Sequence, residues 1–196
     1  MIGKRIFDLV FTTTGSILLS PLLVVIAAFI AAERSGPILY SQERVGLGGR
    51  PFRLWKFRTM RPDSDATALL TVEGDERVTP VGRSLRKWKL DELPQLWNVL
   101  RGEMSLVGPR PEVSRYVNLY TPEQRRVLDL KPGITDPASL AYRDESVVLR
   151  GAADIERLYV EELMPDKIRL NLEYARTASV WSDFVVILRT IGALFR

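Results

Sequence analysis

The feature that most constrains this chain is a long apolar stretch near its start, which runs from Leu9 to Ala32 without a charged residue. A run of more than roughly 18 apolar residues is a candidate for a membrane helix. Lys4 and Arg5 precede the run, as basic residues do in a secretory signal peptide, but the run is too long for the apolar part of such a peptide. The remaining alternatives are a membrane helix and a helix buried in a soluble core.

Ser20-Pro21 lies at the midpoint of this run. Proline inside a helix removes one hydrogen bond and clashes with the carbonyl four residues back, here that of Ile17, although a nearby Ser can satisfy the freed group. Each half of the run rises about 18 Å, about half of a bilayer's hydrocarbon core. Basic residues flank both ends, and cytoplasmic flanks are enriched in Lys and Arg. A re-entrant helix–break–helix over residues 1–34 is therefore favoured over a single span.

The composition narrows the chemistry, because the 196 residues include no Cys and no His. These absences exclude disulfides, thiolate nucleophiles, imidazole acid–base catalysis and most transition-metal enzymes. An enzyme of this composition is expected to use carboxylates, Lys, Arg, Tyr, Ser or Thr, together with an oxygen-liganded cation. The net charge of +4 and the pI near 9.5 point weakly to phosphate, membrane or nucleic acid as a partner.

Residues 35–196 are expected to form a single helix-rich α+β domain with a small sheet. Thr79 and Asp91 are suited to cap two of its helices at their N-termini. Periodicity and turn signals predict a β-hairpin at 38–45 and 52–59, a loop at 61–78, and helices at 79–90, 92–100, 121–130, 152–163, 165–175 and 180–196. The last helix is amphipathic, which suits either a core or a membrane interface.

The densest cluster of charge lies between Arg83 and Pro94, where Asp91 and Glu92 follow four basic residues. Basic residues neutralise phosphate oxygens, while carboxylates hold Mg²⁺ or attack phosphorus. The structural alternative is that Asp91 caps a helix and Glu92 lies in its first turn, where the helix dipole favours acids. Both interpretations remain open at this point.

Three further features suit an anion but also have a simple structural explanation. The glycine-rich segment Gly46–Arg50 lacks the pattern of a phosphate-binding loop, so a hairpin turn explains it best. Lys56 and Arg58 share one face of a predicted strand, facing either an anion or water. Arg110 stands between two prolines, which either pre-position its guanidinium for bidentate phosphate binding or only shape a turn.

Taken together and in order, the motifs of this chain resemble those of the bacterial sugar transferase family, the small monotopic polyprenyl-phosphate phosphoglycosyl transferases. The resemblance extends over residues 4–135. Its motifs are Lys4–Asp8, Ser20-Pro21, Gly36-Pro37, Tyr40–Gly46, Lys56–Met60, Leu90–Leu100, Met104–Glu112 and Lys131–Thr135.

The resemblance implies a reaction and its partners. Family members transfer a sugar-1-phosphate from a UDP-sugar to undecaprenyl phosphate, a polyprenyl phosphate, as the first membrane step of bacterial surface glycan assembly. The implied location is the cytoplasmic face of the inner membrane, with monotopic attachment to the bilayer and residues 35–196 in the cytoplasm. Nucleic acid is not an expected partner, and a homodimer is left open.

The resemblance also implies roles for individual residues. Asp91 would be the nucleophile that forms an aspartyl-phosphosugar intermediate, and Glu92 would help to hold Mg²⁺ close to Asp91. Ser20-Pro21 would be the break of the re-entrant helix. The basic residues around the phosphates would be Lys56, Arg58, Arg86 and Arg110.

The chain departs from the family pattern after Thr135, within the segment Asp136–Glu145. This departure leaves the identity of the sugar open. The charged residues Arg143, Asp144 and Glu145 are candidates for contacts with the donor sugar, or form only a surface ion pair. The alternative to catalysis is a membrane-anchored protein that binds an anionic ligand or serves as a scaffold.

Overall fold

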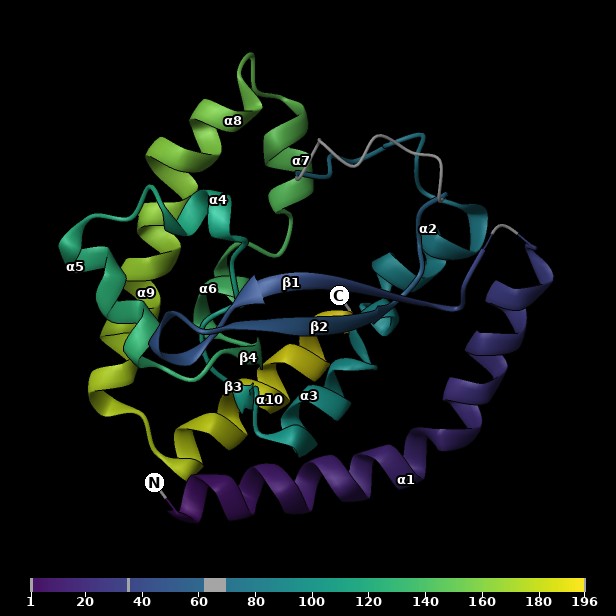
Figure 1. Cartoon of the computed structure of the whole chain (residues 1–196), viewed down its shortest axis with the longest axis horizontal. Coiled ribbons are helices and arrows are strands. Elements are labelled where there is room, and N and C mark those ends of the chain that lie inside the picture. Colours follow the sequence, from purple (N-terminus) through teal and green to yellow (C-terminus); the bar gives the residue numbers. More distant parts are fainter. Residues whose placement is uncertain (1, 35, 62–69, 196) are drawn as a thin grey trace.

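The computed structural model describes residues 2–34, 36–61 and 70–195. Helices dominate this part of the chain and surround two small sheets (Figure 1), which confirms the expected helix-rich α+β class. The helices are α1 Ile2–Ala32, α2 Pro80–Lys87, α3 Gln95–Arg101, α4 Ser114–Val117, α5 Pro122–Arg125, α6 Pro137–Ala141, α7 Glu145–Arg150, α8 Ile155–Leu158, α9 Met164–Thr177 and α10 Val180–Leu194. The strands are β1 Leu39–Val45, β2 Pro51–Phe57, β3 Ser105–Val107 and β4 Gly133–Thr135.

The predicted hairpin is confirmed. β1 and β2 pair antiparallel with Leu39 opposite Phe57, and the turn between them closes with a 2.8 Å hydrogen bond from the Gly46 amide to the Arg50 carbonyl. Gly48 adopts a φ of 65°, a left-handed conformation that glycine reaches without strain. Leu54 and Phe57 are buried, so the hairpin packs one face against the rest of the molecule.

The second sheet, a parallel pair of β3 and β4, was not predicted from the sequence. Its strands have three residues each, too few for a periodic signal. Two segments of the backbone approach each other unusually closely just beyond β3. A Cβ on Gly108 would lie 2.2 Å from the Lys131 carbonyl oxygen. Glycine is therefore required there, and this contact fixes the start of the connector that carries Arg110.

Local signals placed several helices correctly. Thr79 caps α2 by accepting a 2.9 Å hydrogen bond from the Gly82 amide, as predicted. The predicted helices at 152–163 and 165–175 are instead continuous, because a wider π-type turn at Tyr159–Leu163 joins α8 to α9. Of the predicted loop at 61–78, positions 62–69 lie outside the described residues.

The apolar helix α1 contains Pro21 and remains helical through it, so the break predicted at Ser20-Pro21 does not interrupt the helix. The carbonyl freed by the proline, that of Ile17, accepts a 2.8 Å hydrogen bond from the Ser20 hydroxyl, as the sequence predicted. Figure 1 shows that α1 runs along one edge of the molecule and then turns in its second half. Only 11% of its most apolar window is buried, so most of its apolar side chains have no protein neighbour to cover them.

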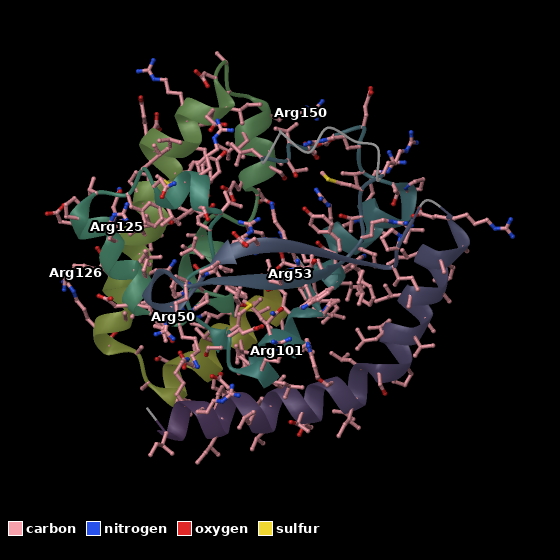
Figure 2. The ribbon with its side chains drawn as sticks, in the orientation of Figure 1. Arg50, Arg53, Arg101, Arg125, Arg126 and Arg150 are labelled. Atoms are coloured by element: carbon pink, nitrogen blue, oxygen red, sulfur yellow. The ribbon has the colours of Figure 1, made fainter. Side chains whose placement is uncertain are left out.

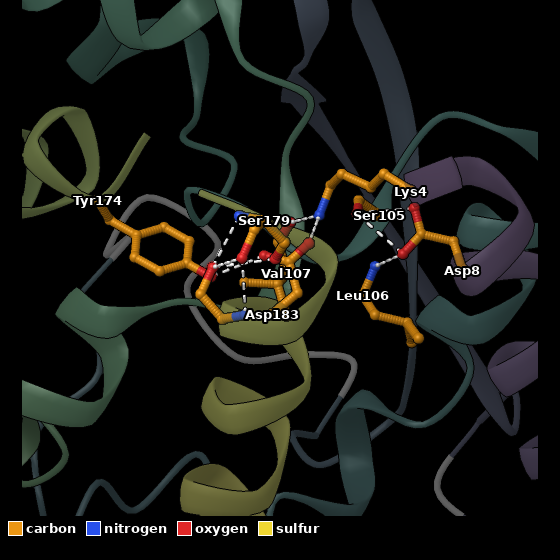
Figure 3. Close-up of polar contacts among 9 residues, drawn as sticks. Lys4, Asp8, Ser105, Leu106, Val107, Tyr174, Ser179 and Asp183 are labelled. Carbon is orange, nitrogen blue, oxygen red and sulfur yellow. Dashed lines mark hydrogen bonds and ion pairs between the residues drawn. The ribbon is translucent and has the colours of Figure 1, made fainter. Parts of the chain in front are cut away.

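The beginning of α1 is attached to the globular part of the protein by charged side chains (Figure 3). Lys4 forms an ion pair with Asp183 of α10 and donates to the Val107 carbonyl at 3.0 Å. Asp8 accepts a 2.8 Å hydrogen bond from the Ser105 hydroxyl, and Arg5 donates to the carbonyls at the end of α3. Charged groups are buried only when paired, so these contacts define a specific docking position.

The end of α1 is attached to the same globular part. Ile26 and Ile30 are buried in a cluster with Phe57 and Leu85. Arg58 donates a 3.1 Å hydrogen bond to the Ile30 carbonyl, one of the backbone acceptors left free near a helix C-terminus. Both ends of α1 therefore contact the globular part, while its middle remains uncovered.

Candidate active site

Asp91 and Glu92 lie in the short connection between α2 and α3, within a 3-10 turn at Leu90–Glu92. The preceding residue, Lys89, has a φ of 54°. This left-handed conformation costs free energy in residues other than glycine and is uncommon for them. The prediction that Asp91 caps the next helix is wrong, because α3 begins only at Gln95 and no side chain caps it. The competing structural explanation for the two carboxylates is thereby removed.

Glu92 is held by two cations. Its Oε1 accepts hydrogen bonds from Lys56 Nζ at 2.9 Å and Arg110 Nη2 at 2.6 Å, and its Oε2 accepts one from Arg110 Nη1 at 3.2 Å. Burial alone would raise the pKa of Glu92, but the charges of Arg110 and Lys56 outweigh it and hold the pKa well below its usual range. The two bases therefore favour the ionised form of Glu92, which in turn holds both of them in place.

Asp91 has the opposite environment, although it is the next residue. It is 6% exposed, and among the described residues no donor lies within hydrogen-bonding reach of its Oδ1. Burial raises the pKa of Asp91, and the negative charge of Glu92 raises it further, against the pull of Lys56, Arg86 and Lys89. A buried polar atom without a partner requires an explanation, and a reactive or ligand-binding role supplies one.

Arg86 lies near enough to Asp91 for its positive charge to lower the pKa of that carboxyl. It projects from the last turn of α2, where the Thr59 hydroxyl accepts a 2.9 Å hydrogen bond from its Nε. The pKa of Arg86 itself is lowered, chiefly by burial. Of the predicted phosphate-binding residues, the structure therefore brings Lys56, Arg86 and Arg110 to the carboxylate pair.

Arg110 is presented by a connector that is held from both sides. The Pro109 carbonyl accepts a 3.0 Å hydrogen bond from the Gly133 amide, and the Pro111 carbonyl accepts one of 3.1 Å from Arg44 Nη1. The Arg110 side chain remains 38% exposed while it grips Glu92 with two nitrogens. A guanidinium held in this way has donors left over for a bidentate contact with phosphate.

Arg58 is not brought to the carboxylates. It is 5% exposed, donates to the Ile30 carbonyl at the end of α1, and lies 3.9 Å from Glu33 Oε2. β2 ends at Phe57, so the strand alternation that places Lys56 and Arg58 on one face stops between them. Within the described part of the chain, Arg58 therefore supports the end of the apolar helix α1.

The segment Asp136–Glu145 contributes to this region through Asp136, whose charge raises the pKa of Arg110, and through one of the three predicted sugar contacts. Arg143 and Asp144 are exposed, whereas Glu145 is half-buried and accepts 2.8 Å and 2.9 Å hydrogen bonds from Lys167. The charge of Glu145 also contributes to the raised pKa of Arg110, after the larger effect of Glu92. Glu145 is therefore near enough to the site for its charge to act on Arg110, whereas the other two candidates are exposed.

Sequence reasoning missed a small cavity beside Arg110, with a volume of about 50 Å³. Its polar lining comes from segments far apart in the chain, so no local pattern marks it. The polar residues that line it are Arg110, Glu112, Tyr120, Asp136, Tyr159, Lys167 and Asn171.

The expected Mg²⁺ can be tested against the oxygen donors near the pair. Among the described residues, no group of three or more Asp or Glu side chains gathers to form an all-protein metal cage. Mg²⁺ in phosphoryl-transfer sites is usually held by one or two carboxylates together with substrate phosphates. Among residues 2–34, 36–61 and 70–195, no donor reaches Asp91 Oδ1, and Glu92 Oε2 accepts one bond of 3.2 Å, so the pair fits this second mode.

Many of the other arginines lie on the outside of the molecule. Figure 2 shows Arg50 and Arg53 on the hairpin, Arg101 at the end of α3, and Arg150 at the end of α7, all of them exposed. Lys56 and Arg86 at the carboxylate pair are instead half-buried, so the exposed arginines provide positions for control substitutions.

Comparison with known proteins identifies a family whose sequences this chain matches. A family model described as "Bacterial sugar transferase" matches residues 1–196. A UDP-glucose:undecaprenyl-phosphate glucose-1-phosphate transferase from Caulobacter vibrioides is 40% identical over 195 residues, which are 97% of this chain and 69% of that protein. A UDP-N-acetylgalactosamine-undecaprenyl-phosphate N-acetylgalactosaminephosphotransferase from Aeromonas hydrophila is 37% identical, over 97% of this chain and 43% of its own length.

Relatives differ in how much of their length this chain covers. A protein from Bacillus subtilis described as an uncharacterized sugar transferase, EpsL, is 46% identical over 74% of this chain and 71% of its own length. The chain spans only 40% of a relative from Klebsiella pneumoniae and 39% of one from Escherichia coli, both named UDP-glucose:undecaprenyl-phosphate glucose-1-phosphate transferases.

Proposed function

Because this chain belongs to the bacterial sugar transferase family, we propose that it transfers a sugar-1-phosphate from a UDP-sugar to undecaprenyl phosphate and releases UMP. The observation that carries the proposal is the unequal carboxylate pair. Glu92 is neutralised by Lys56 and Arg110, whereas Asp91 is buried with a free oxygen and a raised pKa. The names of the relatives supply the classes of donor and acceptor.

In the first proposed step, an Asp91 carboxylate oxygen attacks the β-phosphorus of the UDP-sugar. A P–O bond forms to Asp91, and the P–O bond to UMP breaks, with UMP leaving as an anion. Desolvation increases the basicity of Asp91, and hence its reactivity as a nucleophile, because water no longer stabilises its charge. The product is an aspartyl-phosphosugar on the enzyme.

In the second proposed step, an oxygen of undecaprenyl phosphate attacks the same phosphorus, and the bond to Asp91 breaks. The acceptor is already ionised, so no base is needed to deprotonate it, in agreement with the absence of His from the sequence. Arg86, Lys56 and Arg110 neutralise the phosphoryl oxygens in both steps, and fixed charges of this kind usually provide the largest catalytic contribution. When bound, Mg²⁺ would add positive charge at the same oxygens, held by Asp91 and Glu92.

The proposed attachment to the membrane is re-entrant, at the cytoplasmic face of the inner membrane. Two observations support it: both ends of α1 contact the same globular part, and the apolar middle of the helix is uncovered. Exposed aromatic side chains on α3 and α10, Trp97 and Trp181, suit the boundary between membrane and water. A single span would require one attached end to detach and cross the bilayer.

The absence of Cys permits a direct test of this topology. Gly3→Cys and Arg34→Cys introduce single thiols at the two ends of α1, where a Cβ on Gly3 has open space and Arg34 is exposed. A membrane-impermeant maleimide applied from the cytoplasmic side should label both variants, and neither should react from the outside. Labelling from opposite sides would indicate a single span.

Turnover tests the proposed reaction. Asp91→Asn is expected to abolish UMP release from UDP-sugar, and a labelled phosphosugar should be trapped on the wild-type protein but not on this variant. Asp129→Asn, at an exposed position, serves as the control and should retain full turnover. Substantial UMP release by Asp91→Asn would refute the nucleophile, and UDP-sugar binding without UMP release by the wild type would favour a non-catalytic binding protein.

A further inference from the structure

The cavity beside Arg110 lies between the connector that carries this arginine and helix α9. On one side are Arg110 and Glu112, and on the other are Lys167 and Asn171 of α9. Arg110 belongs both to the cavity wall and to the pair with Glu92, so the cavity opens next to the groups that would bind the donor phosphates. A group attached to the β-phosphate on the Arg110 side would point toward this cavity.

Several polar groups in the cavity wall have hydrogen-bonding capacity left. The Tyr120 hydroxyl hydrogen-bonds to no other group in the described part of the chain, although the residue is 8% exposed. Burial and the nearby charge of Glu112 raise the pKa of Tyr120, so its hydroxyl is protonated and can donate. Asn171 donates through Nδ2 to Asp136 at 3.1 Å, which leaves its carbonyl oxygen as an acceptor.

The charges that line the cavity balance. Arg110 and Lys167 are positive, whereas Glu112 and Asp136 are negative. The two cations already pair with carboxylates, Arg110 with Glu92 and Lys167 with Glu145, whereas Glu112 and Asp136 accept hydrogen bonds from the neutral residues Tyr159 and Ser139. Among the described residues, an anionic substituent would therefore find no cation in the wall that lacks a carboxylate partner, while hydroxyl and amide groups would find donors and acceptors.

We propose that this cavity is the subsite for the outer substituents of the donor sugar, and that it selects an uncharged sugar. The inference rests on the proposed function and assigns specificity to Tyr120 and Lys167, neither of which belongs to the carboxylate pair. At ~10–15 Å³ for each water centre, a volume of about 50 Å³ holds only a few waters. The sugar ring thus stays at the mouth under Arg110, and its substituents replace those waters.

Tyr120→Phe is the primary test, because it removes one hydroxyl and keeps the ring that packs in the core. Turnover is measured with UDP-glucose, UDP-N-acetylgalactosamine and UDP-glucuronic acid. The wild type should use at least one of the two uncharged donors and discriminate against the glucuronic acid donor at least tenfold in kcat/KM. Tyr120→Phe should lower kcat/KM for the preferred donor by about 2- to 12-fold, the value of one neutral hydrogen bond.

Inhibition by UDP, which has no sugar, separates this subsite from the phosphate site. Its inhibition constant should be the same in Tyr120→Phe and in the wild type, because the substitution acts only on the sugar. Lys167→Met is the second variant, since it removes the ammonium that faces Tyr159 and Glu145. Arg169→Met, on the exposed face of the same helix, is the control and should change neither measurement.

The outcomes distinguish the two proposals. If the wild type releases no UMP from any UDP-sugar, the proposed function itself is wrong. If the wild type is active but Tyr120→Phe and Lys167→Met both keep the wild-type ratio of kcat/KM between donors, the cavity is not the sugar subsite. Equal use of UDP-glucuronic acid and the uncharged donors would overturn the selection for an uncharged sugar.

Discussion

Replacing the proposed nucleophile should make the folded protein more stable. Asp91 is buried with an unsatisfied oxygen, next to the ionised Glu92. Ionised Asp91 therefore destabilises the folded state, as its raised pKa indicates. Asp91→Asn keeps the shape of the side chain and removes the charge, so the destabilisation should disappear.

The size of the effect follows from the charge, because Asn keeps a polar side chain at the same position and removes only the ionisation. A buried unsatisfied group costs about 1–3 kcal/mol, and more when it is charged, so removing the charge is expected to recover on the order of 1–3 kcal/mol. For a chain of this length, 1 kcal/mol corresponds to about 2–4 °C in Tm. The expected gain for Asp91→Asn at neutral pH is therefore roughly 2–12 °C, measured by thermal unfolding of the purified protein in detergent micelles. Asp129→Asn, at an exposed position, should stay within about 0.5 kcal/mol of the wild type.

The pH dependence identifies the cause. The pKa of Asp91 is raised in the folded state, while an unfolded Asp titrates near pH ~3.9. The folded state thus holds its proton more tightly, and the stability of the wild type falls as pH rises from the unfolded pKa through the folded one. The advantage of Asp91→Asn should be fully present above that window and should vanish below about pH 3.9. A variant that is less stable than the wild type at neutral pH, or whose advantage is independent of pH, would refute the reasoning.

Two further substitutions test the supports of the site. Glu92→Gln should lower the free energy of unfolding by about 3 kcal/mol, because Lys56 loses its charge partner. This value is the lower end of the range for breaking a buried ion pair, since Arg110 is partly exposed. Calorimetry should show a lower Tm than in the exposed control Glu123→Gln, and an equal Tm would contradict the pairing. Gly133→Ala would place a Cβ 2.1 Å from the Gly108 nitrogen and should prevent folding, scored as loss of the monodisperse peak in gel filtration. Its control Gly192→Ala, which has open space, should fold normally, and normal folding of both would show that the close approach is not required.

Local signals in the sequence were sufficient where the structure is decided locally. The hairpin, the Thr79 cap and the bond from Ser20 to Ile17 each depend on residues close together in the chain. The parallel pair of β3 and β4 depends instead on two short segments separated by several helices, which leave no periodic signal. The close approach of Gly108 and Gly133 sets this pairing and is not encoded near either residue.

The carboxylate pair shows the same limit at the site. In the sequence, Asp91 and Glu92 are adjacent acids of equal standing, and a helix cap explains both. Their difference comes from distant partners: Lys56 lies on β2, and Arg110 lies on a connector after β3. Asp91 Oδ1, in contrast, has no donor among the described residues. Strand alternation could not predict that Lys56 and Arg58 have different surroundings, because the alternating pattern does not show that β2 ends at Phe57, between them.

The position of Arg58 connects the apolar helix α1 to the proposed active site. Arg58 binds the Ile30 carbonyl at the end of α1, and the next residue, Thr59, accepts a hydrogen bond from Arg86. The positive charge of Arg86 in turn lowers the pKa of Asp91. The end of the apolar helix α1 is therefore connected to the proposed nucleophile through Arg58, Thr59 and Arg86. Under the proposed re-entrant attachment, these contacts would connect the helix in the bilayer to the site that receives the acceptor phosphate, which would give the docking of both ends of α1 a physical reason.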